Sequence, residues 1–147
     1  MKLLPIQQTR LDNAHFIGNP DCEPGLSMTI DFFNRVGYVP PWIGYFVELD
    51  GKLVGSAAFK GQPKAGRVEI AYGTFPAYQN RGVGTEVCKQ LVRLALQADP
   101  LVTVTARTLP EESYSTHILR KNKFICLGTV WDEEDGDVWE WAYQSRA

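Results

Sequence analysis

The chain has few of the residues that build metal sites or covalent crosslinks. Its 147 residues include three cysteines and two histidines. The cysteines, Cys22, Cys88 and Cys126, are far apart and lack a CxxC spacing, which predicts reduced thiols in a cytoplasmic protein. Cys88 and Cys126 stand at positions that we expect to be buried. His15 and His117 are separated from these cysteines, so no metal site is predicted.

Long apolar runs and a surplus of one charge are also missing. No apolar segment approaches the length of a membrane span, and the first residues do not resemble a signal peptide. Lysine and arginine number 15 against 17 aspartates and glutamates, and both signs are spread along the chain. A nucleic-acid-binding protein normally has a basic face. We therefore expect neither a membrane nor a nucleic-acid partner.

The composition is that of a globular domain. Hydrophobic residues make up 44% of the chain and charged residues 22%, which is enough to build a core without crosslinks. No internal repeat or low-complexity linker interrupts the sequence. The length suits one domain, predicted over residues 1–147.

Hydrophobic periodicity and turn residues predict a mixed sheet with helices on its faces. Asp50-Gly51 is typical of a tight hairpin turn, and the apolar residues of 81–98 recur at helical spacing. Predicted strands span 2–8, 43–49, 52–59, 67–74, 101–106, 124–131 and 138–143. Predicted helices span 25–36, 81–98 and 112–121. The fold class is thus α+β, with a mostly antiparallel sheet of six to seven strands.

The most informative segment joins the strand over 67–74 to the long helix. Gly82 and Gly84 stand where the backbone turns into that helix, and its free N–H groups with the helix dipole favour a phosphate. Thr85 follows Gly84 without the lysine of a Walker loop. Val87 occupies the place of the third glycine in a dinucleotide fingerprint, so both of these alternatives fail.

This loop resembles the coenzyme A loop of the GNAT superfamily, Gln/Arg-x-x-Gly-x-Gly/Ala, with Gln79, Gly82 and Gly84 in the matching places. Residues 115–124 are similar to a second family segment, Asn-x-x-Ser-x-x-x-Leu-x-Lys-x-Gly-Phe, although Glu112 and Lys123 depart from it. Residues 138–141 look like the last strand of the branch that acetylates ribosomal-protein N-termini. The resemblance covers roughly residues 67–143.

The resemblance implies an N-acetyltransferase that uses acetyl-coenzyme A, without a metal, and acts on the amine of a small molecule or a peptide N-terminus. The fourth and fifth strands would separate, and the pantetheine arm would bind backbone groups near Gly73, Thr74 and Phe75. The pyrophosphate would be held by the main chain of Gln79, Asn80, Arg81, Gly82, Val83, Gly84 and Thr85. The alternative is a coenzyme-binding sensor or interaction module without catalysis.

The resemblance also suggests catalytic residues. Glu69 is the predicted general base, and its alternative role is an ion pair with Arg67 or Lys60. Many family members use a tyrosine as the general acid where this chain has Leu119. Ser115 is therefore our first candidate for the general acid, and we also expect it to contact the coenzyme. The alternative role of its hydroxyl is a hydrogen bond to the backbone. Tyr114 is the second candidate.

The acceptor site is the least determined part. Phe32, Trp139 and Tyr143 are the predicted acceptor contacts, although aromatic residues on strands and helices are usually core residues. Asp132-Glu-Glu-Asp-Gly-Asp137 would attract a cation or form a solvated turn. Exposed strand edges at the last hairpin make a homodimer plausible.

Overall fold

Asp50 and Gly51 close the hairpin from which the sheet extends. Their φ angles are 52° and 77°, the left-handed values that a two-residue hairpin turn requires. The flanking strands are β2 (Gly44–Leu49) and β3 (Lys52–Phe59), within one residue of the prediction. The computed structural model describes residues 1–144.

The described residues contain one seven-stranded sheet in the order β1-β2-β3-β4-β5-β7-β6. Only β4 and β5 run parallel, and the other neighbours are antiparallel. The remaining strands are β1 (Lys2–Pro5), β4 (Arg67–Thr74), β5 (Thr103–Thr108), β6 (Phe124–Asp132) and β7 (Gly136–Tyr143). The predicted α+β class and mixed, mostly antiparallel sheet are confirmed.

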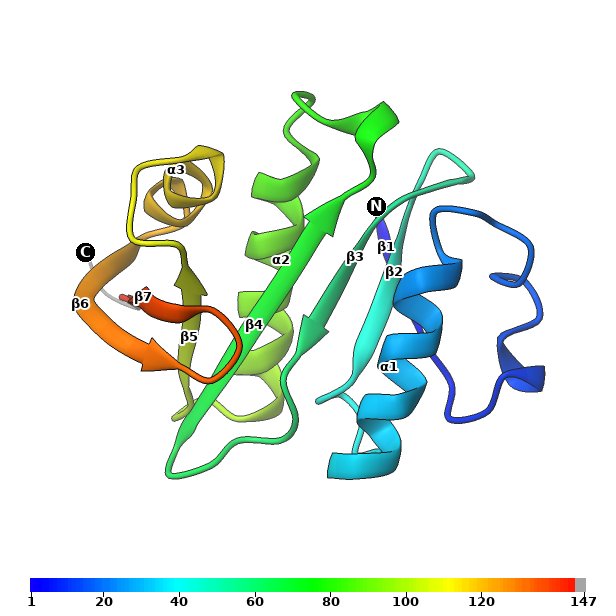
Figure 1. The fold of residues 1–147 in the computed structure, drawn as a ribbon, viewed down its shortest axis with the longest axis horizontal. Coiled ribbons are helices and arrows are strands. Elements are labelled where there is room, and N and C mark those ends of the chain that lie inside the picture. Colours follow the sequence, from blue (N-terminus) through cyan, green and yellow to red (C-terminus); the bar gives the residue numbers. More distant parts are fainter. Residues whose placement is uncertain (145–147) are drawn as a thin grey trace.

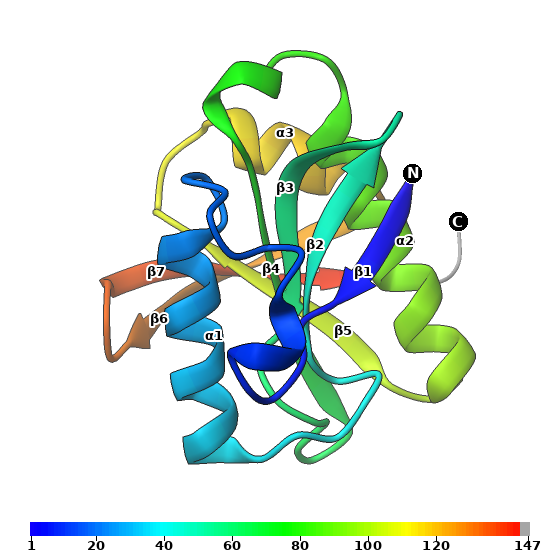
Figure 2. The ribbon, with the colours of Figure 1, turned by 90° about the vertical axis from the view of Figure 1, so that its right-hand side faces the viewer.

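Helices cover both faces of this sheet (Figures 1 and 2). The long helices α1 (Glu23–Val36) and α2 (Val83–Ala98) lie on opposite faces, and α3 (Tyr114–Lys121) packs against α2. Helix α3 starts two residues later than predicted because Ser113 caps it, forming a capping box with Thr116. Short 3-10 turns, η1 (Leu11–Asn13) and η2 (Pro76–Tyr78), complete the described elements.

The core lies on both faces of the sheet, under α1 on one side and α2 on the other. Val83, Val87 and Leu91 of α2 are buried, as their spacing predicted. Cys22 and Cys88 are buried free thiols, and burial raises the pKa of the Cys88 thiol to about 12. The prediction for Cys126 is wrong: its side chain is exposed because β6 is the outermost strand. None of the helices in residues 1–144 is both long and apolar enough to span a membrane.

Candidate active site

Strands β4 and β5 separate after a short parallel contact (Figure 1). Within the described chain their pairing runs from Arg67↔Thr103 to Glu69↔Thr105. Beyond that point β4 continues beside β3 to Thr74, while β5 pairs with β7 through Thr108. The separation of the fourth and fifth strands that the resemblance implied is therefore present, and it opens one edge of β4.

Alternation along β4 decides which backbone groups face the gap. The Phe75 N–H donates to the Val54 carbonyl at 2.9 Å, and the Glu69 carbonyl accepts from the Lys60 N–H at 2.9 Å, so these residues face β3. Backbone groups of alternate residues point to opposite sides of a strand. Tyr72 and Thr74 consequently present their backbone groups to the gap, and Ile70 presents its carbonyl, because its N–H lies at the last rung of the β4–β5 pairing. Of the three residues predicted to contact the pantetheine arm, Thr74 has its backbone at the gap, whereas the backbone groups of Gly73 and Phe75 face β3.

A cavity of about 170 Å³ occupies the gap. Glu69 lines it from β4 and Ser115 from α3, so the two predicted catalytic residues share one cavity. The Glu69 side chain is 22% exposed, and Ser115 is an exposed residue. Leu119 adds a buried apolar wall. The cap of α3 is Ser113, whose hydroxyl accepts the Thr116 N–H.

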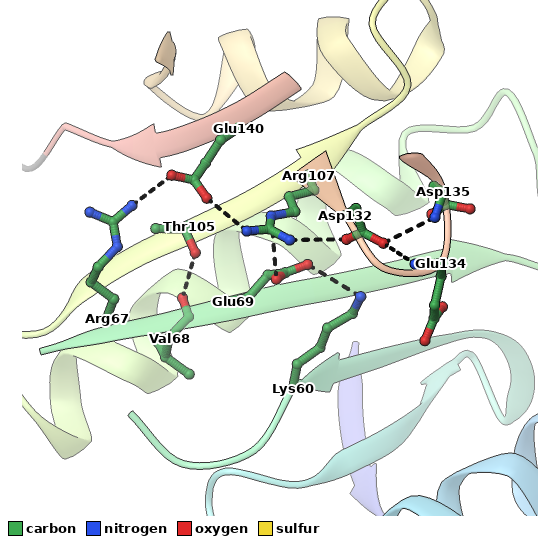
Figure 3. A network of polar contacts seen from close by, with 10 residues as sticks. All are labelled: Lys60, Arg67, Val68, Glu69, Thr105, Arg107, Asp132, Glu134, Asp135 and Glu140. Carbon is green, nitrogen blue, oxygen red and sulfur yellow. Dashed lines mark hydrogen bonds and ion pairs between the residues drawn. The ribbon is translucent and has the colours of Figure 1, made fainter. Parts of the chain in front are cut away.

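Glu69 belongs to a chain of ion pairs at the polar end of the cavity (Figure 3). Its carboxylate lies 3.3 Å from Lys60 Nζ and 3.9 Å from Arg107 Nε. Arg67 pairs with Glu140 at 2.9 Å rather than with Glu69. Of the alternative partners predicted for Glu69, the structure therefore contains Lys60.

Arg107 connects three strands, and it was not predicted from the sequence as part of the site. It contacts Asp132 on β6 at 3.0 Å and Glu140 on β7 at 3.3 Å. Burial lowers the pKa of the Arg107 guanidinium, but its contacts with Asp132, Glu69 and Glu140 outweigh this and raise it. The one signal in the sequence is a charged residue inside a strand otherwise made of threonine, valine and alanine.

Asp132 is held as a carboxylate at the β6–β7 turn. It accepts the backbone N–H groups of Glu134 and Asp135 as well as Arg107 Nη1. The Glu134 N–H, then Arg107 and the Asp135 N–H, lower the pKa of this carboxyl group. Part of the acidic segment therefore stabilises its own turn, and Asp132 and Asp135 also line the cavity.

The predicted phosphate loop lies between η2 and α2. Asn80 and Gly82 have φ angles of 64° and 78°, and the Gln79 side chain donates to the Thr74 carbonyl at 3.2 Å. The N–H groups of a helix's first turn have no partner within the helix, which leaves those of Val83 to Thr85 for a ligand. These N–H groups are the donors that we expect to hold the pyrophosphate.

The two glycines of the loop serve different purposes. A Cβ on Gly82 would meet nothing within 4 Å, so its role is the left-handed turn beside open space. A Cβ on Gly84 would lie 2.8 Å from Ile118 Cδ1. Gly84 therefore permits close packing of α3 on α2. Arg81 lies over the Tyr78 ring, 6.0 Å from its centroid.

The three predicted acceptor contacts lie outside this cavity wall. Phe32 on α1 packs against the core beneath Arg35. Alternation along β7 places Trp139 and Tyr143 on the face opposite Glu140. Tyr143 lines a separate groove along α2.

The chain belongs to the GNAT acetyltransferases: residues 12–125 match the family model described as an acetyltransferase (GNAT) domain. A curated relative, the uncharacterized N-acetyltransferase YjdG of Bacillus subtilis (strain 168), is 25% identical over 96 residues, or 65% of this chain. The chain spans about half the length of that relative, 54%.

Solved structures share the fold. A spermidine N-acetyltransferase SpeG chimera from Vibrio cholerae and hSSAT has a TM-score of 0.72 at 14% identity, with 97% of this chain and 95% of that chain covered. RimL, a ribosomal L7/L12 alpha-N-protein acetyltransferase in complex with coenzyme A, has a TM-score of 0.69 at 15% identity, with coverage of 95% and 91%. Aminoglycoside acetyltransferase AAC(6')-Ib in complex with coenzyme A has a TM-score of 0.61 at 21% identity, with 70% of this chain and 66% of that chain covered. The predicted superfamily and fold are confirmed.

Proposed function

We propose that the chain transfers an acetyl group from acetyl-coenzyme A to the amine of a small molecule or a peptide N-terminus. The observation that carries this proposal is the cavity between β4 and β5, which Glu69 and Ser115 line from different elements. Membership of the GNAT family supports the reaction class.

The residues around the gap fit the coenzyme. The first-turn N–H groups of α2 and the open space beside Gly82 would hold the pyrophosphate. The Ile70 carbonyl and the backbone groups of Tyr72 and Thr74 would pair with the pantetheine amides, as a neighbouring strand would. When bound, acetyl-coenzyme A supplies the activated acyl group as a thioester.

The chain's own groups then have three tasks. Glu69 accepts a proton from the acceptor amine, because an ammonium has no lone pair for attack; such a base is worth about 10²–10⁴-fold in rate. The N–H of Tyr72 or Thr74 faces the gap and stabilises negative charge that develops there. Ser115, across the cavity, donates a proton to the departing sulfur. Acetyl transfer is direct, without an acyl-enzyme.

A panel of amines tests this function. The purified chain is incubated with acetyl-coenzyme A and a polyamine, an aminoglycoside, amino acids or peptides with free N-termini, and thiol release is measured. This choice follows the acceptors named for the structural neighbours. We expect thiol release with at least one class, and acetyl-coenzyme A should raise the melting temperature. Absence of thiol release with every amine would contradict the proposal.

A coenzyme-binding module without catalysis is the second candidate. Glu69 is already paired with Lys60, and buried Leu119 stands where many relatives carry a tyrosine. This candidate predicts a thermal shift with acetyl-coenzyme A but no thiol release with any amine.

A homodimer and a cytoplasmic location stay predictions. The outermost strand β6 exposes Ile125, Leu127 and Trp131, and an apolar sheet edge can pair with another copy. Sedimentation of the purified chain at several concentrations will measure the dimer directly.

A further inference from the structure

An alkyl amine of the chain itself already lies beside the proposed base. Lys60 follows β3, and its backbone N–H donates to the Glu69 carbonyl. Its side chain lines the same cavity as Glu69 and Ser115, with Nζ 3.3 Å from Glu69 Oε2 (Figure 3). Lys60 is therefore positioned as an acceptor amine would be.

The Lys60 side chain has room to move toward the acyl group. It is 45% exposed and ends a flexible four-carbon stem. Lys60 and Glu69 line this cavity together with Ile70 and Tyr72 of β4. The edge of β4 at these last two residues is where the proposed function, on which this inference rests, places the pantetheine arm.

Glu69 keeps a cationic partner if Lys60 loses its charge. Arg107 Nε is buried and has no hydrogen-bond acceptor among the described residues, although Glu69 Oε1 lies only 3.9 Å away. A buried donor without a partner is costly. A small rotation of Glu69 toward Arg107 satisfies this donor and leaves Nζ free.

We propose that Lys60 is a self-acetylation site. After the ammonium has lost one proton to solvent, neutral Nζ forms a bond to the acyl carbon of acetyl-coenzyme A. The carbon–sulfur bond breaks, and its electron pair stays on sulfur. Glu69 takes the proton that Nζ loses on becoming an amide, and this proton passes on to the thiolate. The products are acetyl-Lys60 and free coenzyme A.

Other lysines provide internal controls. Lys64 lies in the same β3–β4 connection and Lys52 at the start of β3, both exposed. Neither lines the cavity around Glu69. Uncatalysed acetylation by the thioester would reach these two side chains at least as readily as Lys60.

The experiment needs only the full chain and acetyl-coenzyme A, without an added amine. Intact mass and peptide mapping over time should show one acetyl group on Lys60, gained at least about tenfold faster than on Lys64 or Lys52. The rate per molecule should not depend on protein concentration, because transfer is intramolecular. Lys60→Arg should abolish this fast phase and Lys64→Arg should keep it, while Glu69→Gln should slow it by about 10²-fold or more.

Each outcome decides between the proposals. Equal labelling of Lys60, Lys64 and Lys52, or labelling that Glu69→Gln leaves unchanged, overturns self-acetylation. Thiol release with added amines but an unlabelled Lys60 overturns it and preserves the proposed function. If neither label nor thiol release occurs, the proposed function is contradicted as well. The wild-type peptide map gives this decision even if a variant does not fold.

Discussion

Gly84 and Ile118 pack so closely that a Cβ on Gly84 would lie 2.8 Å from Ile118 Cδ1. This contact joins the first turn of α2, which forms the predicted phosphate site, to α3, which carries Ser115. The Asn122 amide strengthens the same junction by donating to the Thr85 carbonyl at 3.1 Å. The helix contact therefore sets the distance between the phosphate site and the cavity.

Gly84→Ala should destabilise the chain. Overpacking of a core contact costs about 1–3 kcal/mol, which opposes the gain of about 1 kcal/mol from alanine in a helix. We expect a net loss of up to about 2 kcal/mol, measured by denaturant unfolding.

Ile118→Val removes the atom in conflict and tests this explanation. The double variant should lose less stability than the sum of the two single variants. Strict additivity would show that the Gly84–Ile118 contact is not the cause.

Glu69→Gln should lower turnover by about 10²–10⁴-fold if Glu69 is the general base. The coenzyme sites lie on other groups, so the thermal shift with acetyl-coenzyme A should persist. Glu140→Gln is the matched control, because Glu140 is a similarly buried carboxylate of the same ion-pair chain outside the cavity wall. Equal losses in both variants would assign Glu69 a structural role.

Ser115→Ala should affect turnover but not stability, whereas Ser113→Ala should affect stability. Ser115 lines the cavity, so its variant should lower turnover with little change in melting temperature. Ser113 caps α3, so its loss should cost about 1 kcal/mol of stability. Steady-state kinetics and thermal unfolding of both variants check this, and unchanged turnover in Ser115→Ala would remove it from the mechanism.

Asp132 should contribute stability that depends on pH. Its pKa is lowered in the folded chain by the Glu134 N–H, Arg107 and the Asp135 N–H, relative to about 3.9 for a free carboxyl group. A lowered pKa stabilises the fold above the unfolded value, and this contribution is lost as pH falls through the folded value. Asp132→Asn should therefore lower the melting temperature near pH 7, and its difference from the wild type should shrink as the pH falls below the unfolded pKa of about 3.9. Glu133→Gln in the same turn is the control; a constant difference across pH would contradict this account.

Local signals predicted most elements well. Strand β4 has the predicted bounds, and the Asp50-Gly51 turn has the predicted backbone. Boundaries moved where a cap or turn intervened: Ser113 delays α3, and the Val102 N–H bonds the Asp99 carbonyl, so β5 begins at Thr103. Such shifts depend on individual hydrogen bonds, which hydrophobic periodicity does not report.

The cavity wall was predicted only in part. Glu69 and Ser115 belong to recognisable segments, so their chain positions indicated their places. Arg107 was not predicted, and Trp139 and Tyr143 lie on the other face of β7, because strand alternation and sheet order decide which side chains meet. Phe32 lies on α1, outside the cavity wall. Alternate residues of a strand direct their backbone groups to opposite sides, so Gly73 and Phe75 face β3 rather than the gap.

The sequence by itself determined the α+β class, the glycine turn before α2 and the family, because each depends on residues close together in the chain. The tertiary structure alone decided that the separation of β4 and β5 begins after Glu69, and that Arg107 links the Glu69–Lys60 pair to Asp132. These contacts join residues from β3 to β6. Their energy comes from packing and charge across distant segments, for which no local pattern exists.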